Sequence, residues 1–182
     1  MMKSNLICDM QFGSTGKGLI AGYLAMRDKP DTVVTAWSPN AGHTFIDSDG
    51  RKFVHSMLAN GVVSPQLKTI LIGPGSVLNV DLLAKEIISC KDLLDGKKII
   101  IHPNAAIVLD SHRDSEKQLA RIGSTMKGSA EAVIHKMRRQ LAGNNTAKHM
   151  MADEWLYNLI HGHLSLTVEC DSVSYMDAMY DS

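Results

Sequence analysis

Residues Gln11-Phe12-Gly13-Ser14-Thr15-Gly16-Lys17-Gly18 form a glycine-rich turn near the start of this 182-residue chain. The apolar run Leu6–Met10 before the turn predicts a buried strand, and the run Gly18–Arg27 after it predicts a helix. Such a turn exposes backbone N–H groups at a helix N-terminus and places a lysine beside them, which is an arrangement that receives phosphate. The residues predicted to bind phosphate are Gly13, Ser14, Thr15, Gly16, Lys17 and Gly18.

The spacing of this turn differs from that of the standard P-loop. That motif has four residues between its first glycine and its Gly-Lys pair, and a Ser or Thr follows the lysine. Here two residues separate Gly13 from Gly16, and Gly18 follows Lys17. The sequence therefore predicts a phosphate-binding turn of a different kind.

A second loop, Ser38–Thr44, follows a second apolar segment, Thr32–Trp37. It carries Asn40-Ala41-Gly42-His43-Thr44 at the position expected of a loop at the end of a strand. Ligands in open α/β sheets bind at the carboxyl ends of the strands, so both loops are expected at one edge of a sheet.

Together the two loops resemble the adenylosuccinate synthetase family, whose members carry similar sequences in the same order. The resemblance continues through Asn60–Val63, Ile72–Val77 and Ile122–Thr125, as far as about Arg139. It implies a largely parallel α/β sheet with flanking helices, in a P-loop-NTPase-like fold of which this chain holds a part.

One departure separates the chain from the ordinary members of that family. Ser14 and Thr15 stand where the usual loop has an acidic pair, and Phe12 replaces a tryptophan. These changes resemble a phage branch that joins L-aspartate to dGMP with ATP and forms 2-amino-2'-deoxy-N6-succinyladenylate. The alternatives are the ordinary reaction with IMP and GTP, and a nucleotide-binding module without catalytic activity.

The resemblance also implies roles for individual residues around the triphosphate. His43 would act as a general acid, and Lys17 would bind the transferred phosphoryl group. Gly42 would offer a carbonyl oxygen to Mg²⁺, and Thr44 would lie beside the nucleotide. Ser14 occupies the position of the usual base and metal ligand, although a serine hydroxyl cannot serve as that base.

Further positions would bind the monophosphate substrate. Arg139 matches an arginine that reaches the monophosphate in a neighbouring subunit, which implies a homodimer. The residues expected around dGMP are Ser14, Asn40, Ala41, Ser124, Thr125 and Arg139.

Composition limits the classes of partner. The formal net charge is zero, which gives no general attraction to nucleic acid or to an acidic membrane. Three widely spaced cysteines, Cys8, Cys90 and Cys170, favour a reducing compartment over a disulfide framework. No apolar run approaches the length of a membrane span, and the N-terminal residues lack a signal-peptide pattern. We therefore expect a protein of the host-cell cytoplasm if the gene belongs to a phage.

Apolar runs alternate with helix-like runs along the chain, which predicts a mostly parallel α/β sheet. Asp47–Val54 has the chemistry of a hairpin turn. We expect a nucleotide-binding core at residues 1–142 and a separate tail at 143–182, which would be the start of a missing C-terminal half. The remaining predicted strands are Thr69–Ile72 and Lys98–His102, and the remaining predicted helices are Asp81–Leu94 and Ala130–Leu141.

Overall fold

The computed structural model describes residues 4–11, 15–117, 125–138, 145–150 and 167–180. Its centre is a four-stranded sheet in which every neighbouring pair of strands is parallel. The strand order is β1-β4-β6-β8. The strands are β1 (Thr32–Thr35), β4 (Thr69–Ile72), β6 (Lys98–Ile101) and β8 (Thr167–Glu169).

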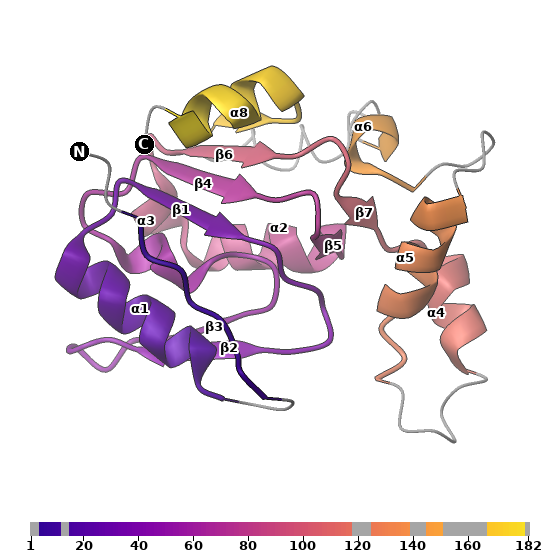
Figure 1. Cartoon of the computed structure of the whole chain (residues 1–182). Helices are drawn as coiled ribbons and strands as arrows, with labels where there is room; N and C mark the ends of the chain where they lie inside the picture. The colour runs from indigo at the N-terminus through magenta and orange to yellow at the C-terminus, as the bar shows by residue number, and fades with distance from the viewer. Residues whose placement is uncertain (1–3, 12–14, 118–124, 139–144, 151–166, 181–182) are drawn as a thin grey trace.

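Side chains alternate between the two faces of this sheet, and helices cover both (Figure 1). On one face Ile70 and Ile99 belong to the main core, with Leu83 and Ile87 of helix α2 (Val80–Ser89). On the other face Leu71 and Ile100 pack with Tyr175 of α8 (Ser172–Tyr180). Full burial of such side chains stabilises a fold by about 1.5–3 kcal/mol each. This burial explains the near-continuous apolar runs in β4 and β6.

Helix α1 (Lys17–Asp28) packs against an antiparallel hairpin. The hairpin joins β2 (His43–Ile46) to β3 (Lys52–His55), as the turn chemistry predicted. A Cβ atom on Gly22 of α1 would lie 2.2 Å from the ring of Phe45. The glycine therefore lets α1 lie directly on β2, where Phe45 is buried.

A smaller part of the fold extends beyond the carboxyl ends of β4 and β6 (Figure 1). Val77 and Ala106 pack there with Ala132. The carboxylate of Glu116 accepts hydrogen bonds at 2.8 Å from the backbone N–H groups of Gly128 and Ala130, which fixes the start of α5. The elements are β5 (Val77–Leu78), β7 (Ala106–Ile107), α4 (Asp110–Glu116), α5 (Ser129–Arg138) and α6 (Ala147–Met150).

Two predictions of secondary structure were wrong. Leu6–Met10 does not form a strand, and Leu6 and Met10 are 89% and 95% exposed. An apolar run becomes a strand only where a neighbouring strand pairs with its backbone, and β1 is paired with β4 alone among the described residues. The predicted helix Asp81–Leu94 is divided at Cys90, between α2 and α3 (Lys91–Leu94).

The predicted mostly parallel α/β sheet is confirmed, as are the helix after the glycine-rich turn and the hairpin. The division into residues 1–142 and 143–182 stays a prediction, although β8 places residues 167–169 in the main sheet. No helix among the described residues is long and apolar enough to span a bilayer.

Candidate active site at the start of helix α1

The glycine-rich turn leads directly into α1. Gly16 is the residue before the helix and has a φ of 78°, a left-handed conformation that glycine adopts without strain. It provides no capping side chain, and the first turn of α1 contains no acidic residue. The first N–H groups of the helix thus have no side-chain acceptor from the cap, which suits the binding of an anion. Gly13 and Ser14 lie outside the described residues.

A carboxylate from the N-terminal segment reaches the start of this helix. Asp9 accepts a hydrogen bond from the hydroxyl of Thr15 and pairs with the ammonium group of Lys17. The side chains of Lys17 and Asp9 are each 26% exposed. The hydrogen bond from Lys17, followed by that from Thr15, lowers the pKa of the Asp9 carboxyl below its usual value. Asp9 is therefore ionised at neutral pH.

His43 lies at the same site, at the start of β2. Its ring stacks on that of Trp37, with 3.7 Å between the ring centroids and 23° between the planes. Burial lowers the pKa of His43 below its usual value, and the positive charge of Lys17 lowers it further, whereas Asp9 acts in the opposite direction. The structure therefore brings His43, Lys17 and Asp9 within electrostatic reach of one another.

Asn60 fixes the spacing between the helix and the second loop. This residue begins the 3-10 helix η1 (Asn60–Val63) and is fully buried. Its side-chain N–H group donates to the carbonyl oxygen of Gly18 at 3.0 Å and to that of His43 at 3.1 Å. The amide oxygen of Asn60 faces Nδ1 of His55 at 3.0 Å. A side chain buried with all its polar groups bonded holds its neighbours in one arrangement.

Gly18 allows this close approach. A Cβ atom at Gly18 would lie 2.7 Å from Cβ of His43 and 2.8 Å from the amide nitrogen of Asn60. These distances are too short for any real Cβ contact. A side chain at position 18 would therefore push α1 away from His43.

The second loop also contacts the start of α5. The side-chain oxygen of Asn40 accepts hydrogen bonds at 2.8 Å from the hydroxyls of Thr125 and Ser129. Asn40 and Thr125 are exposed, as is Ala41. The structure thus joins two of the residues predicted around dGMP across 85 positions of sequence. Ser124 and Arg139 lie outside the described residues.

Of the two remaining predicted residues of this loop, Gly42 borders the site and Thr44 faces away from it. Gly42 is exposed and immediately precedes His43, so its backbone borders the site. Thr44 is exposed on β2 and pairs with the exposed Val54. Because side chains alternate along a strand, Thr44 faces away from the side that carries His43 and Phe45. The structure therefore does not bring Thr44 to Lys17, and its role in nucleotide binding stays a prediction.

A hollow of about 630 Å³ adjoins this site between α1, β1 and residues 4–7. Lys17, Trp37 and Asn60 are among the residues that line it. Its volume lies within the range of about 300–1,000 Å³ typical of pockets for small ligands. The hollow is therefore large enough for part of a nucleotide.

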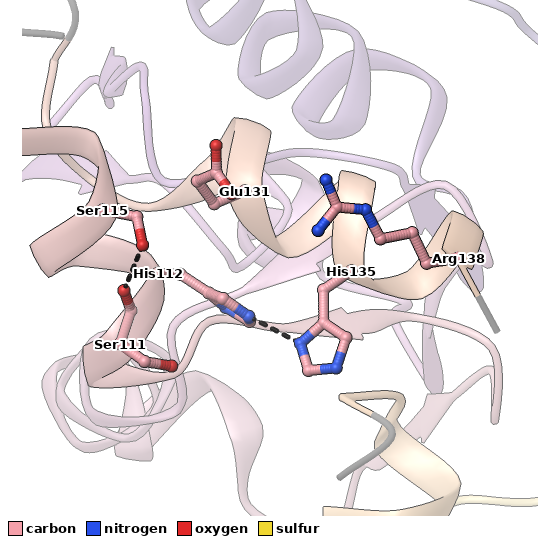
Figure 2. Close-up of a pocket in the computed structure, with 6 residues that line it drawn as sticks. All are labelled: Ser111, His112, Ser115, Glu131, His135 and Arg138. Atoms are coloured by element: carbon pink, nitrogen blue, oxygen red, sulfur yellow. Dashed lines mark hydrogen bonds between the residues drawn. The ribbon is translucent and has the colours of Figure 1, made fainter. Parts of the chain in front are cut away.

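A smaller hollow of about 160 Å³ lies between α4 and α5 (Figure 2). His112 accepts a backbone hydrogen bond from Leu109 on Nδ1, which leaves Nε2–H of His112 to donate to Nδ1 of His135 at 2.8 Å. The histidine pair thereby joins the two helices. The volume is below the usual range for a nucleotide pocket, and no sequence-predicted site residue lines it. The residues drawn in Figure 2 are Ser111, His112, Ser115, Glu131, His135 and Arg138.

The sequence analysis gave no role to three residues that the structure places at the main site. Asp9 precedes the turn in a run interpreted as strand, Trp37 ends the next apolar run, and Asn60 lies in a segment noted only for its resemblance. The available signal for Asp9 was a charged residue inside an apolar run, and that for Asn60 was a polar residue directly after Met57–Ala59. The sequence gives no sign of the stacking of Trp37 on His43.

Fold and site together define a parallel α/β protein in which a glycine-rich turn leads into a helix, with a lysine and a histidine at one place. The chain belongs to the adenylosuccinate synthetase family, because the family model of that description matches residues 6–178.

Comparison with known proteins adds detail within this family. The chain is 51% identical over 183 residues to N6-succino-2-amino-2'-deoxyadenylate synthase of Salmonella phage PMBT28, covering 99% of this chain and 50% of that protein. It is 30% identical over 145 residues to adenylosuccinate synthetase of Methanococcus aeolicus, covering 77% of this chain and 43% of the other. The chain is thus more similar to the phage synthase than to the archaeal enzyme.

A solved structure of a phage protein is also similar to this chain. The succinoaminodeoxyadenylate synthetase of cyanophage S-2L, bound to dGMP and to dATP as an energy donor, superposes with a TM-score of 0.78 at 40% identity. The match covers 94% of this chain and 46% of the cyanophage protein. The chain spans about half the length of the curated relatives it matches.

Proposed function

We propose that this chain acts as a ligase that joins L-aspartate to dGMP, with phosphate binding and phosphoryl transfer at the start of α1. The triphosphate would be ATP, and the products would be 2-amino-2'-deoxy-N6-succinyladenylate, ADP and phosphate. The observation that carries the proposal is the placement of Lys17 and His43 at one site, at the start of α1 and beside a hollow of nucleotide size. Similarity to the phage synthase supports dGMP over IMP.

The chemistry requires O6 of the purine to be phosphorylated before an amine displaces it, because an oxo group is a poor leaving group. Lys17 and the first N–H groups of α1 would bind the transferred phosphoryl group and stabilise its charge. His43 is held neutral by burial and by Lys17, so it would donate a ring N–H hydrogen bond toward the reacting oxygens rather than carry a charge. Trp37 stacks on the ring and limits its rotation.

The exposed loop residues suit the monophosphate side of the site. Asn40 and Thr125 already share a hydrogen bond, and their remaining polar groups would contact dGMP. Ala41 lies beside them, and Ser14, Ser124 and Arg139 would complete the set by family position. Contribution of Arg139 from a second subunit would make the active form a homodimer in the host cytoplasm.

A requirement for Mg²⁺ is implied by membership of the adenylosuccinate synthetase family. Among the described residues no group of three or more His, Cys, Asp or Glu side chains is placed to hold a metal. Mg²⁺ commonly uses one or two protein oxygens together with substrate phosphates, and the exposed Gly42 could supply a carbonyl oxygen, with Ser14 as the second predicted ligand. When bound, the ion would neutralise charge on the transferring phosphoryl group.

A second candidate function is nucleotide binding without catalysis. The anion-accepting start of α1 and the hollow beside it would bind a nucleotide whether or not aspartate is transferred. In that case the site described here would act as a binding module.

One experiment separates these functions. The purified 182-residue chain is incubated with Mg²⁺, L-aspartate, ATP or dATP, and either dGMP or IMP, and products are measured by phosphate release and mass spectrometry. The ligase predicts a succinylated product from dGMP that requires aspartate. Preferential use of IMP would contradict the choice of substrate. Binding of nucleotide by calorimetry without any succinylated product would favour the module, and absence of both would contradict the two proposals.

A further inference from the structure

Phosphorylation of O6 of a guanine base needs a proton acceptor beside N1. In the lactam form N1 carries a proton, and O6 becomes nucleophilic as that proton leaves. A carboxylate is the suitable acceptor at neutral pH, whereas a serine hydroxyl is already protonated and is a very weak base. Because Ser14 cannot accept the N1 proton, another residue must provide the proton acceptor.

Asp9 is the carboxylate that the structure places at the start of α1. It contacts Lys17 and Thr15, and its charge reaches His43. These three partners come from the turn and the second loop, so Asp9 lies where the two predicted binding loops meet. The side chains of Asp9 and Lys17 are each 26% exposed, so a bound nucleotide could reach both of them.

The contact with Lys17 places this carboxylate beside the group that would bind the transferred phosphoryl group. A lysine ammonium has three N–H donors, so Lys17 can bind Asp9 and a phosphoryl oxygen at the same time. In the transfer the phosphorus bonds to O6, and O6 is attached to C6 beside N1. A carboxylate held by the same ammonium group is thus close to the edge of the base that carries N1–H.

We propose that Asp9 accepts the N1 proton of guanine and, through the same contact, selects guanine over adenine. The proposal rests on the function proposed above, because it assigns a residue to the base of the same substrate. The N1–H bond breaks, its proton moves to a carboxylate oxygen of Asp9, and its electron pair forms the N1=C6 double bond. The C6=O6 π electrons form the O6–P bond, and the bond from the γ-phosphorus to the bridging oxygen breaks with release of ADP.

Base selection gives a test that does not depend on turnover. A carboxylate can accept from N1–H of guanine but has no hydrogen to donate to N1 of adenine. An asparagine side chain offers both an acceptor and a donor. Calorimetry of the 182-residue chain with dGMP and with dAMP, in the presence of Mg²⁺ and a non-hydrolysable ATP analogue, measures the preference.

We expect the wild-type chain to bind dGMP about tenfold or more tightly than dAMP, since a site that leaves a polar group unpaired rejects the wrong base. Asp9→Asn should reduce this ratio to about threefold or less, and Asp9→Glu should retain most of it. The matched control is Asp114→Asn, which removes another exposed Lys–Asp pair, that with Lys117 at 2.6 Å, and should leave the ratio unchanged. If Asp9→Asn does not fold by circular dichroism, Asp9→Ser makes the same test.

The outcomes distinguish this inference from the function on which it rests. An unchanged dGMP to dAMP ratio in Asp9→Asn, with dGMP bound by the wild type, overturns the role of Asp9 and leaves the proposed function standing. Failure of the wild-type chain to bind dGMP overturns both. A ratio that falls in Asp9→Asn and returns in Asp9→Glu supports the role of Asp9.

Discussion

The side-chain amide of Asn60 donates a hydrogen bond to the carbonyl oxygen of His43 at 3.1 Å. Its second bond, to the carbonyl oxygen of Gly18, ties the other predicted binding loop to the same buried residue. Asn60 is therefore the point at which the start of α1 and the start of β2 are held together. The relative position of Lys17 and His43 follows from this link.

Replacement of Asn60 by aspartate is expected to lower the free energy of unfolding by about 3 kcal/mol or more. The change removes both donated bonds and turns a buried carboxylate toward two carbonyl oxygens. Urea denaturation measures the effect. Asn104→Asp, at an exposed position in the loop after β6, is the control and should change stability by less than about 0.5 kcal/mol. Equal stability of Asn60→Asp and wild type would show that the link does not hold the two loops.

Gly18→Ala tests the close approach of α1 to His43. Alanine usually favours a helix over glycine by about 1 kcal/mol, but here its Cβ would lie 2.7 Å from Cβ of His43 and 2.9 Å from the backbone carbon of His43. We expect a net loss of about 1–3 kcal/mol in thermal or urea unfolding, together with weaker ATP binding.

Gly75→Ala provides the matched control for that variant. Its Cβ would meet only Cβ of Ala36 at 3.7 Å, an ordinary contact. Stability should stay within about 0.5 kcal/mol of wild type. If Gly18→Ala raises the free energy of unfolding and leaves ATP binding unchanged, α1 and His43 do not approach each other as closely as the 2.7 Å contact requires.

Stability is expected to fall in mild acid because of His55. Burial lowers the pKa of His55 from 6.5 to about 4, and Nε2 of this ring contacts Sγ of Cys90 at 3.3 Å. Between these values the unfolded chain binds more protons than the folded chain. The contribution of His55 is therefore complete above pH 6.5 and is lost progressively down to pH 4, by up to about 3 kcal/mol.

Urea unfolding of wild type and His55→Gln between pH 7 and pH 4 measures this contribution. The wild-type chain should lose stability more steeply than the variant. Burial raises the pKa of Glu86, but Glu86 is present in both proteins and cancels in the comparison. Identical slopes in the two proteins would contradict the assignment to His55.

The sequence predicted the parts of this structure that local patterns determine. Ile70, Leu71 and Ile72 form a continuous apolar run because both faces of β4 are covered. The turn leads into α1 at Gly16, which adopts the left-handed conformation before the helix without strain. Lys17 and His43 lie together as expected, but for a different reason. Leu6–Met10 is not a strand, and Asn60 instead links the start of α1 to the start of β2.

The missed features depend on long-range packing. Whether Leu6–Met10 pairs as a strand is decided by its neighbour β1, not by its own apolar character. The contacts of Asn60 with Gly18 and His43 cross 42 and 17 positions. Asn40 meets Thr125 and Ser129 across 85 and 89 positions, which no local pattern predicts.

The most direct measurement of the central claim is an NMR titration of the His43 ring in wild type and in Lys17→Met. Lys17 lowers the pKa of His43 and Asp9 acts in the opposite direction, so removal of the lysine charge should raise this pKa. A rise in Lys17→Met, with the other histidines unchanged, is the result expected if Lys17 and His43 share one site. The same His43 pKa in both proteins would contradict it.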